Sequence, residues 1–246
     1  MVNIMFSNNS TLNQQILDKE KMWFSNLYIK LVHRSKNEGS IVSNPFIYGE
    51  ANIDATKKKV MIIGQEARGY NEFRGNLDFN EEQEFTKMYL ERQVYGLNSY
   101  KYNKSPFWDF HRFLKNNNYF PMWNNLDKAH LIVNSKTHPL TVEYEKILNS
   151  DIGNGRSLLQ EEIQISKPKI VVFVTGPNYW ESMASALHCD SGIMYENKPN
   201  TKKYVSDITS IAKLGIRCIW TYHPNFIRRS GYEKYILDDV LKRIDV

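Results

Sequence analysis

Four short runs of apolar residues along the chain predict buried β-strands. They cover residues 60–63, 131–133, 170–174 and 218–221, and they are rich in β-branched side chains. Each run is continuous rather than alternating with polar residues, and each is bounded by residues that break strands. Runs of this kind are typical of strands that helices cover on both faces of a sheet.

Helical patterns lie around and between these runs, at residues 11–32, 80–95, 105–116, 157–165, 177–187 and 232–244. Thr11 and Gln14 form a capping-box pattern at the start of the first, and Asn80 caps the second. Pro106 suits the first turn of the third. Because helices separate the strands, the strands should pair in parallel through right-handed crossovers. The pattern therefore predicts an α/β fold, a three-layer α/β/α sandwich around a central, mainly parallel four-stranded sheet.

The composition is that of a globular protein, with 41% hydrophobic and 24% charged residues. No internal repeat, low-complexity tract or linker divides the chain, so we expect one domain over residues 1–246. No apolar run approaches the roughly 18 residues of a membrane span, and the N-terminus lacks the pattern of a signal peptide. We therefore expect a cytoplasmic protein without a membrane partner.

Charge and cysteine content narrow the possible chemistry. The chain has 32 Lys plus Arg against 27 Asp plus Glu, a net charge of +5. This excess permits an anionic partner such as nucleic acid without requiring one. Cys189 and Cys218 belong to no CxxC pair, so we expect neither an iron–sulfur cluster nor a zinc site held by cysteines.

Ligands bind at the carboxyl ends of the strands in sheets of this kind, so the residues after each run are candidates for function. Gly64, Gln65, Glu66 and Arg68 follow the first run, with Ala67 between the last two. Glu66 could act as a general base or stabilise a cationic transition state. The alternative is a solvated ion pair between Glu66 and Arg68.

Asn134 follows the second run, where its amide could read the polar edge of a planar heterocycle. The alternative is a turn in which the Asn134 side chain binds loop backbone. His138, further along the same loop, is expected to pack within it. The third run ends in Thr175-Gly176-Pro177, which we interpret as structural because glycine and proline suit the turn into the next helix.

The fourth run leads into His223, and a histidine at a strand end can donate to or accept from a ligand near neutral pH. Phe226 and Ile227 form an apolar tip, and Arg228 and Arg229 follow directly. An apolar tip followed by paired positive charge suits a wedge that enters a base stack while phosphates are held. The alternative is a tip that folds inward beside a solvated arginine pair.

The order of these features resembles the uracil-DNA glycosylase superfamily. The matching segments cover residues 60–66, 105–107, 131–134 and 221–224, with a further likeness at residues 167–172 before Gly176. The resemblance covers about residues 59–246, so that residues 1–58 form an N-terminal helical extension and residues 71–104 an insertion.

The resemblance implies a monomeric hydrolase that cleaves the N-glycosidic bond of uracil or another damaged base in DNA after flipping the base. Glu66 and His223 would be catalytic, and Gly64, Gln65, Phe107 and Asn134 would hold the base. Ile227 would be the wedge, with DNA contacts from Arg68, Asn225, Phe226, Arg228 and Arg229. No metal or other cofactor is implied. The partner would be damaged or single-stranded DNA, or a nucleobase.

The chain departs from the family pattern at two places. Ala67-Arg68 stands where proline usually follows the acid or amide, and Asn225-Phe226 replaces Ser-Pro. Two other functions therefore stay open. One is a nucleic-acid or nucleobase binding module that has lost catalysis, and the other is a hydrolase of free nucleosides or nucleotides.

Overall fold

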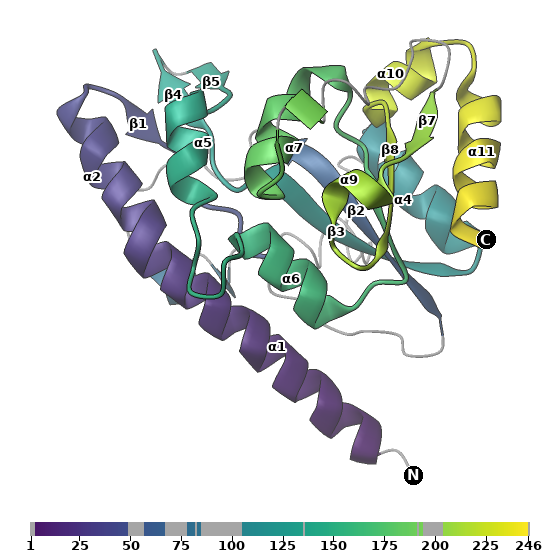
Figure 1. Ribbon diagram of the computed structural model, residues 1–246, viewed down its shortest axis with the longest axis horizontal. Helices are drawn as coiled ribbons and strands as arrows, with labels where there is room; N and C mark the ends of the chain where they lie inside the picture. The colour runs from purple at the N-terminus through teal and green to yellow at the C-terminus, as the bar shows by residue number, and fades with distance from the viewer. Residues whose placement is uncertain are drawn as a thin grey trace.

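A five-stranded sheet forms the centre of the protein (Figure 1). The structure is a computed structural model that describes residues 3–48, 57–66, 78–81, 83–84, 105–134, 136–190, 192–193 and 204–245. The strand order is β3 (Tyr119–Asp127), β2 (Lys58–Glu66), β6 (Ile170–Phe173), β8 (Arg217–Thr221) and β7 (Val205–Asp207). The first four strands run parallel, and β7 pairs with β8 in the antiparallel sense.

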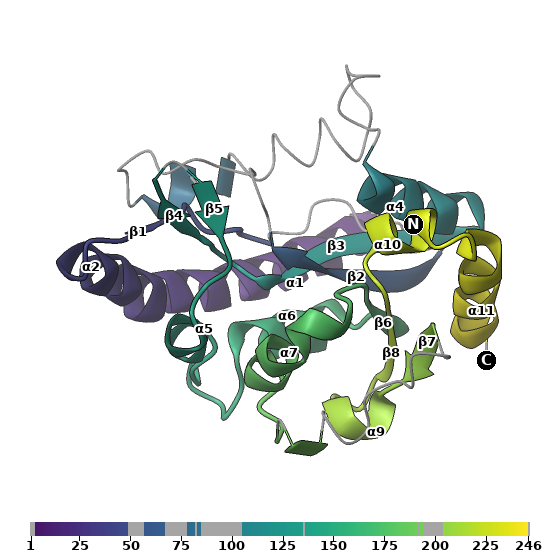
Figure 2. The ribbon, with the colours of Figure 1, turned by 90° about the horizontal axis from the view of Figure 1, so that it is seen from above.

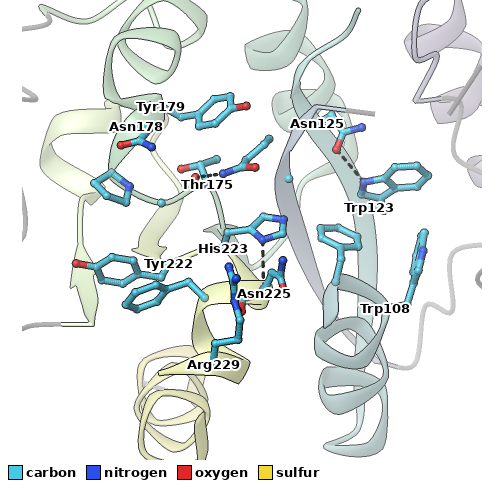
Figure 3. A pocket seen from close by; sticks show the side chains of 16 residues that line it. Trp108, Trp123, Asn125, Thr175, Asn178, Tyr179, Tyr222, His223, Asn225 and Arg229 are labelled. Carbon is cyan, nitrogen blue, oxygen red and sulfur yellow. Dashed lines mark hydrogen bonds between the residues drawn. The ribbon is translucent and has the colours of Figure 1, made fainter. Parts of the chain in front are cut away.

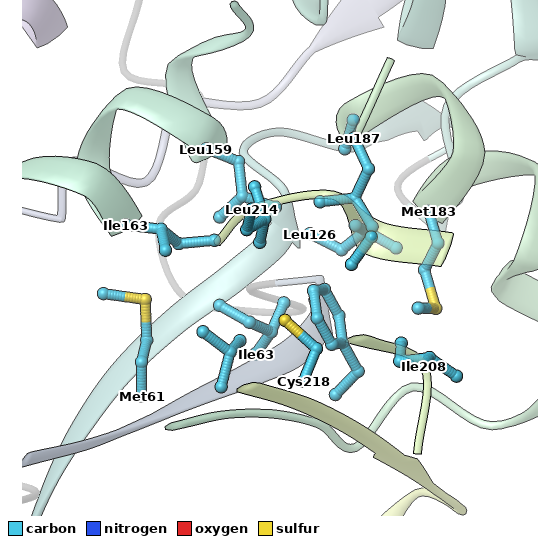
Figure 4. Close-up of a cluster of buried hydrophobic side chains, with 14 of the residues drawn as sticks. Met61, Ile63, Leu126, Leu159, Ile163, Met183, Leu187, Ile208, Leu214 and Cys218 are labelled. Atoms are coloured by element: carbon cyan, nitrogen blue, oxygen red, sulfur yellow. The ribbon is translucent and has the colours of Figure 1, made fainter. Parts of the chain in front are cut away.

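Helices cover both faces of this sheet (Figures 1 and 2). Met61 and Ile63 of β2 pack on the face covered by α6 and α7, and Figure 4 shows part of that cluster. Val60 and Ile62 pack on the opposite face with α4 and α11. The helices beside the sheet are α4 (Pro106–Asn116), α6 (Leu158–Ser166), α7 (Trp180–Ala186), α9 (Thr209–Ala212), α10 (Pro224–Arg229) and α11 (Glu233–Asp245). A strand with both faces buried explains why β2 has a continuous apolar run.

A second apolar core brings the N-terminal helices together with residues 129–158. It comprises α1 (Asn3–Trp23), the π-helical turn η1 (Phe24–Tyr28), α2 (Ile29–Asn37) and α5 (Val142–Leu148). A small antiparallel sheet of β1 (Ile41–Val42), β4 (Leu131–Val133) and β5 (Lys136–His138) completes it. The α1 helix begins at Asn3, so the capping box predicted at Thr11 is wrong.

The main sheet differs from the predicted four-stranded sheet in its strands. Residues 131–133, predicted as a strand of the main sheet, form β4 of the small sheet, and β3, which was not predicted, pairs with β2 in the main sheet. The sequence of β3 does not have the pattern of a buried strand, because it contains Pro121 and ends in polar residues. Proline lacks the N–H that a central strand must donate, and β3 tolerates Pro121 because it is an edge strand.

Several local predictions are confirmed. Pro106 lies in the first turn of α4, as predicted, with Ser105 as the N-cap residue. The helix predicted at residues 157–165 forms as α6, and it begins with a capping box of Ser157 and Gln160 that the sequence reasoning did not identify. The predicted helix 177–187 is a short 3-10 turn, η2 (Pro177–Tyr179), followed by α7. Most of the predicted helix 80–95, and of the insertion 71–104, lies outside the described residues. No helix within the described ranges is both long and apolar enough to cross a membrane.

Candidate functional site

A pocket of about 660 Å³ opens at the carboxyl ends of the four parallel strands (Figure 3). Its walls come from the end of β2, the start of α4, the end of β3, the loop after β6 and the segment from β8 into α10. This is the position at which open α/β sheets bind ligands, and the volume suits a small organic molecule.

The structure brings many of the predicted site residues together here. The pocket is lined by Gly64, Gln65, Phe107, His223, Asn225, Phe226 and Arg229. These residues come from three segments that are far apart in sequence.

Asn134 does not reach the pocket. It lies exposed at the turn between β4 and β5, in the small sheet, with a left-handed φ of 49°. Asparagine tolerates this conformation better than most residues, so the turn accounts for its presence. The prediction that Asn134 reads a ligand in this pocket is therefore corrected, because its strand belongs to the other sheet.

The predicted wedge is also corrected. Ile227 is only 2% exposed and belongs to the core cluster that α4 and α11 also form, because α10, which packs on these two helices, turns its apolar side inward. Phe226 is the exposed apolar residue of the segment, and its ring stacks on Tyr222 with the centroids 4.3 Å apart. Arg228 is exposed and lies 3.6 Å from Asp109, outside the pocket lining.

Of the predicted site residues Glu66 and Arg68, the structure describes only the backbone of Glu66. Glu66 ends β2, and its backbone is the register partner of Asp127 on β3. The Glu66 side chain and the whole of Arg68 lie outside the described part of the chain. The position of Glu66 is thus fixed by its backbone alone, directly after two residues that line the pocket.

Asn125, near the end of β3, is the asparagine that lines the pocket. Its side chain is buried, and its Oδ1 accepts a hydrogen bond from the Trp123 indole N–H at 2.9 Å. Its Nδ2 has no hydrogen-bond partner among the described residues. Buried amide groups are normally paired, and this nitrogen is almost completely covered, so a ligand would reach it only if neighbouring atoms moved.

Gly64 makes room for Asn125. The two residues are register partners on neighbouring strands, and a Cβ on Gly64 would lie 2.7 Å from Asn125 Oδ1. The same Cβ would lie 3.2 Å from the Phe107 ring. A glycine at this position therefore allows β2, the asparagine and the phenylalanine to meet at one point.

A buried polar network supports the end of β3 from behind. Asn124 Oδ1 accepts from the backbone N–H of Asn125 at 2.7 Å, and Asn124 Nδ2 donates to Glu162 at 2.8 Å. Lys128 donates to both Asn124 and Glu162, at 2.5 and 2.6 Å, and both ionic side chains are almost fully buried. The network ties β3 to α6 and fixes the backbone that carries Asn125.

Gln65 joins two strand ends across the pocket. Its Nε2 donates to the carbonyl oxygen of Thr175 at 2.6 Å (Figure 3). Gly176 follows with a left-handed φ of 73°, and its N–H donates to Thr221 O at 3.3 Å. Thr175-Gly176-Pro177, which we interpreted as structural, therefore also lines the site.

His223 lies two residues beyond the end of β8 and is the N-cap residue of α10. Its Nδ1 accepts a hydrogen bond from the Asn225 backbone N–H at 3.2 Å, so the neutral ring carries its proton on Nε2. Burial lowers the pKa of His223, and the charge of Arg229 lowers it further. The ring is therefore neutral near pH 7 and presents an N–H donor in the pocket (Figure 3).

Aromatic rings form opposite sides of the pocket. Phe107, Trp108 and Trp123 pack edge to face on the side of α4 and β3, with centroids 5.1 to 6.0 Å apart. Tyr222 lies on the other side (Figure 3), and the ring of Phe226, which also lines the pocket, stacks on it. Flat apolar walls with polar groups between them suit a planar heterocyclic ligand.

The sequence reasoning missed Asn125, Trp123 and Tyr222. One signal was present for Asn125, since a polar pair ends the aromatic-rich segment 119–123. Within the described ranges, no group of three or more His, Cys, Asp or Glu side chains is arranged to hold a metal ion. Comparisons of the chain with models of known protein families and with curated protein sequences find no match.

Proposed function

We propose that the protein is a uracil-DNA glycosylase-like hydrolase that removes uracil or another damaged base from DNA. The observation that carries the proposal is one aromatic-walled pocket lined by both His223, whose neutral ring carries its proton on Nε2, and Asn125, whose buried Nδ2 has no partner among the described residues. Gln65 and Gly64 complete the polar side, at the strand end where Glu66 follows.

Each group has a role in hydrolysis of an N-glycosidic bond. As that bond breaks, positive charge develops on the sugar and negative charge on the departing base. The N–H of His223 would stabilise the charge on a carbonyl oxygen of the base, and a carboxylate at Glu66 would stabilise the sugar cation. Water supplies the hydroxyl group to the sugar carbon and the proton to the released base.

The recognition of the base is assigned to Phe107 and Asn125. Phe107 offers its ring for stacking, because it lines the pocket beside Gly64. We assign to Asn125 the role that the resemblance implied for Asn134, because Asn125 lines the pocket near the end of a strand of the main sheet. No cofactor has a part in the proposed reaction.

Release of free base from oligonucleotides that each carry one uracil or one damaged base tests the proposal. The matched variants are Asn125→Asp, which replaces the donor by an acceptor, and Asn134→Asp, which makes the same change at an exposed turn. We expect base release by the wild type and Asn134→Asp, and a loss of a hundredfold or more in Asn125→Asp, on the scale of removing one essential transition-state contact. Thermal unfolding checks that both variants fold.

Two results would refute the proposal. Oligonucleotide binding without release of any base would leave a binding module, as the changed residues Ala67-Arg68 and Asn225-Phe226 suggest. Hydrolysis of free nucleosides but not of oligonucleotides would assign the pocket to small-molecule substrates. Equal activity of the two asparagine variants would remove the assignment of Asn125.

A further inference from the structure

Four aromatic side chains continue from the pocket across the neighbouring surface. Phe226 stacks on Tyr222 at 4.3 Å, with an interplanar angle of 24°. The ring centroids of Tyr222 and Tyr204 lie 5.9 Å apart. Those of Tyr204 and Tyr232 lie 5.3 Å apart, with an interplanar angle of 31°. We call Phe226, Tyr222, Tyr204 and Tyr232 the aromatic row.

The backbone holds the row in place from three elements. Tyr222 directly follows β8, and Tyr204 directly precedes β7, where its carbonyl oxygen accepts from Thr221 Oγ1 at 2.9 Å. Tyr232 precedes α11, and its N–H donates to Ser230 Oγ at 3.0 Å. The rings are therefore fixed relative to the pocket before any ligand arrives.

The row is open to solvent at both ends. Phe226 is 41% exposed at the pocket, and Tyr232 is 55% exposed at the far end. Tyr222 and Tyr204 between them are half-buried. Large rings that are both fixed and exposed in a continuous group indicate a surface that contacts a partner.

Positive charge lies beside the row. Arg228 and Arg229 are exposed on α10, and Arg229 also lines the pocket. Asp109 is the acidic group near Arg228, at 3.6 Å, and Arg112 also binds it. Among the described residues, Arg228 and Arg229 together carry more charge than the one carboxylate near them, so an anionic backbone is the fitting partner.

The geometry of α10 favours bases that are already unpaired. Ile227, at the expected wedge position, is buried in the core. Phe226 lies flat against Tyr222 instead of projecting as a blade. A flat ring offers its face to a base that has been freed from its partner strand, as in proteins that bind single strands.

We propose that the aromatic row binds single-stranded DNA next to the pocket, with unpaired bases stacked on the rings and phosphates held by Arg228 and Arg229. The inference rests on the proposed function in that the target base of the same strand would occupy the pocket. It adds the substrate class, single-stranded rather than duplex DNA, and a binding surface beyond the pocket.

Fluorescence anisotropy with a short labelled oligo(dT) tests the row without requiring catalysis. Two variants, Phe226→Ala and Tyr232→Ala, each remove one exposed ring. Tyr235→Ala is the matched control, because Tyr235 is 64% exposed on the next helix and shares none of the ring contacts of the row. Unfolding curves show whether each variant keeps the stability of the wild type.

We expect oligo(dT) to bind at least tenfold more tightly than a duplex of the same length. Phe226→Ala and Tyr232→Ala should each weaken binding by about tenfold, the usual scale of one base–aromatic stack. Tyr235→Ala should leave it unchanged. Duplex binding as tight as single-strand binding, or equal affinities for Tyr232→Ala and Tyr235→Ala, would overturn the inference.

The two proposals fail separately. Base release from a uracil oligonucleotide that is unaffected by Tyr232→Ala overturns the aromatic row and leaves the proposed function intact. Oligo(dT) binding that depends on Tyr232, without release of any base, supports the row and overturns the glycosylase.

Discussion

An alanine at position 64 should push Asn125 out of place. The added Cβ would lie 2.7 Å from Asn125 Oδ1 and 3.2 Å from the Phe107 ring, and the first distance is shorter than a van der Waals contact allows. Both neighbours are held, Asn125 by the Trp123 indole and Phe107 by its aromatic neighbours. Overpacking of this kind typically costs about 1–3 kcal/mol of folding free energy.

Asn125→Ala isolates the steric part of that cost. On its own it removes one hydrogen bond, worth about 1 kcal/mol, together with a buried Nδ2 that lacks a partner among the described residues, so its net effect should be small. It also removes the atom that the new Cβ would strike. In the Asn125→Ala background, Gly64→Ala should therefore cost about 1–2 kcal/mol less than in the wild type, a coupling typical of residues in contact.

Urea unfolding of the wild type, the two single variants and the double variant measures this coupling. Gly39→Ala is the control, because Gly39 has a φ of 74° and nothing within 4 Å of its added Cβ. Its cost comes from backbone conformation and should be the same with or without Asn125. Additive effects of Gly64→Ala and Asn125→Ala, within about 0.3 kcal/mol, would refute the packing described here.

Three further measurements test the electrostatics. Because burial and a nearby arginine lower the pKa of His223 from its usual 6.5, base release should stay level as the pH falls through 6.5 and decline only at more acidic pH; a decline centred on 6.5 would contradict the neutral ring. Burial lowers the pKa of His111 from 6.5 to about 4, so the neutral ring contributes about 3 kcal/mol of stability above pH 6.5 that is lost as the pH falls toward 4. Unfolding of wild type and His111→Phe across that range should show the difference, and parallel curves would refute it. Glu162→Leu leaves Lys128 buried without its carboxylate and should cost about 3–5 kcal/mol, most of which the double variant with Lys128→Met recovers. A single variant as stable as the double variant would show that the pair is not buried as described.

The parts of the fold that the sequence predicts well are those set by local pattern. β2, β6 and β8 are continuous apolar runs because both of their faces are buried. Ser157 and Gln160 specify the start of α6 through backbone groups within one turn. Such features depend on near neighbours in the chain, so they are visible without the tertiary structure.

The errors come from choices that tertiary structure makes. The apolar run 131–133 was predicted as a strand of the main sheet, but it belongs to the small sheet, and the main sheet instead contains β3, which includes Pro121. An edge strand can contain proline because it hydrogen-bonds to a neighbour on one side only, but the sequence alone does not predict which strand lies at the edge. Ile227 was similarly ambiguous, because an apolar residue next to Phe226 can face either the core or the solvent, and α10 turned it inward.

The donor character of the pocket depends on two hydrogen bonds that residue identity alone does not reveal, each between residues two positions apart in sequence. Asparagine and histidine each carry both donor and acceptor capacity, so their identities alone do not fix what a ligand meets. In the folded chain the Trp123 indole N–H donates a hydrogen bond to Asn125 Oδ1, and the Asn225 backbone N–H donates one to His223 Nδ1. His223 Nε2 and the buried Asn125 Nδ2 are therefore the N–H groups of these side chains that have no hydrogen-bond partner among the described residues. If the ligand is a nucleobase, as proposed, carbonyl oxygens would meet these donors favourably, whereas an exocyclic amino group would set donor against donor and leave buried groups unpaired.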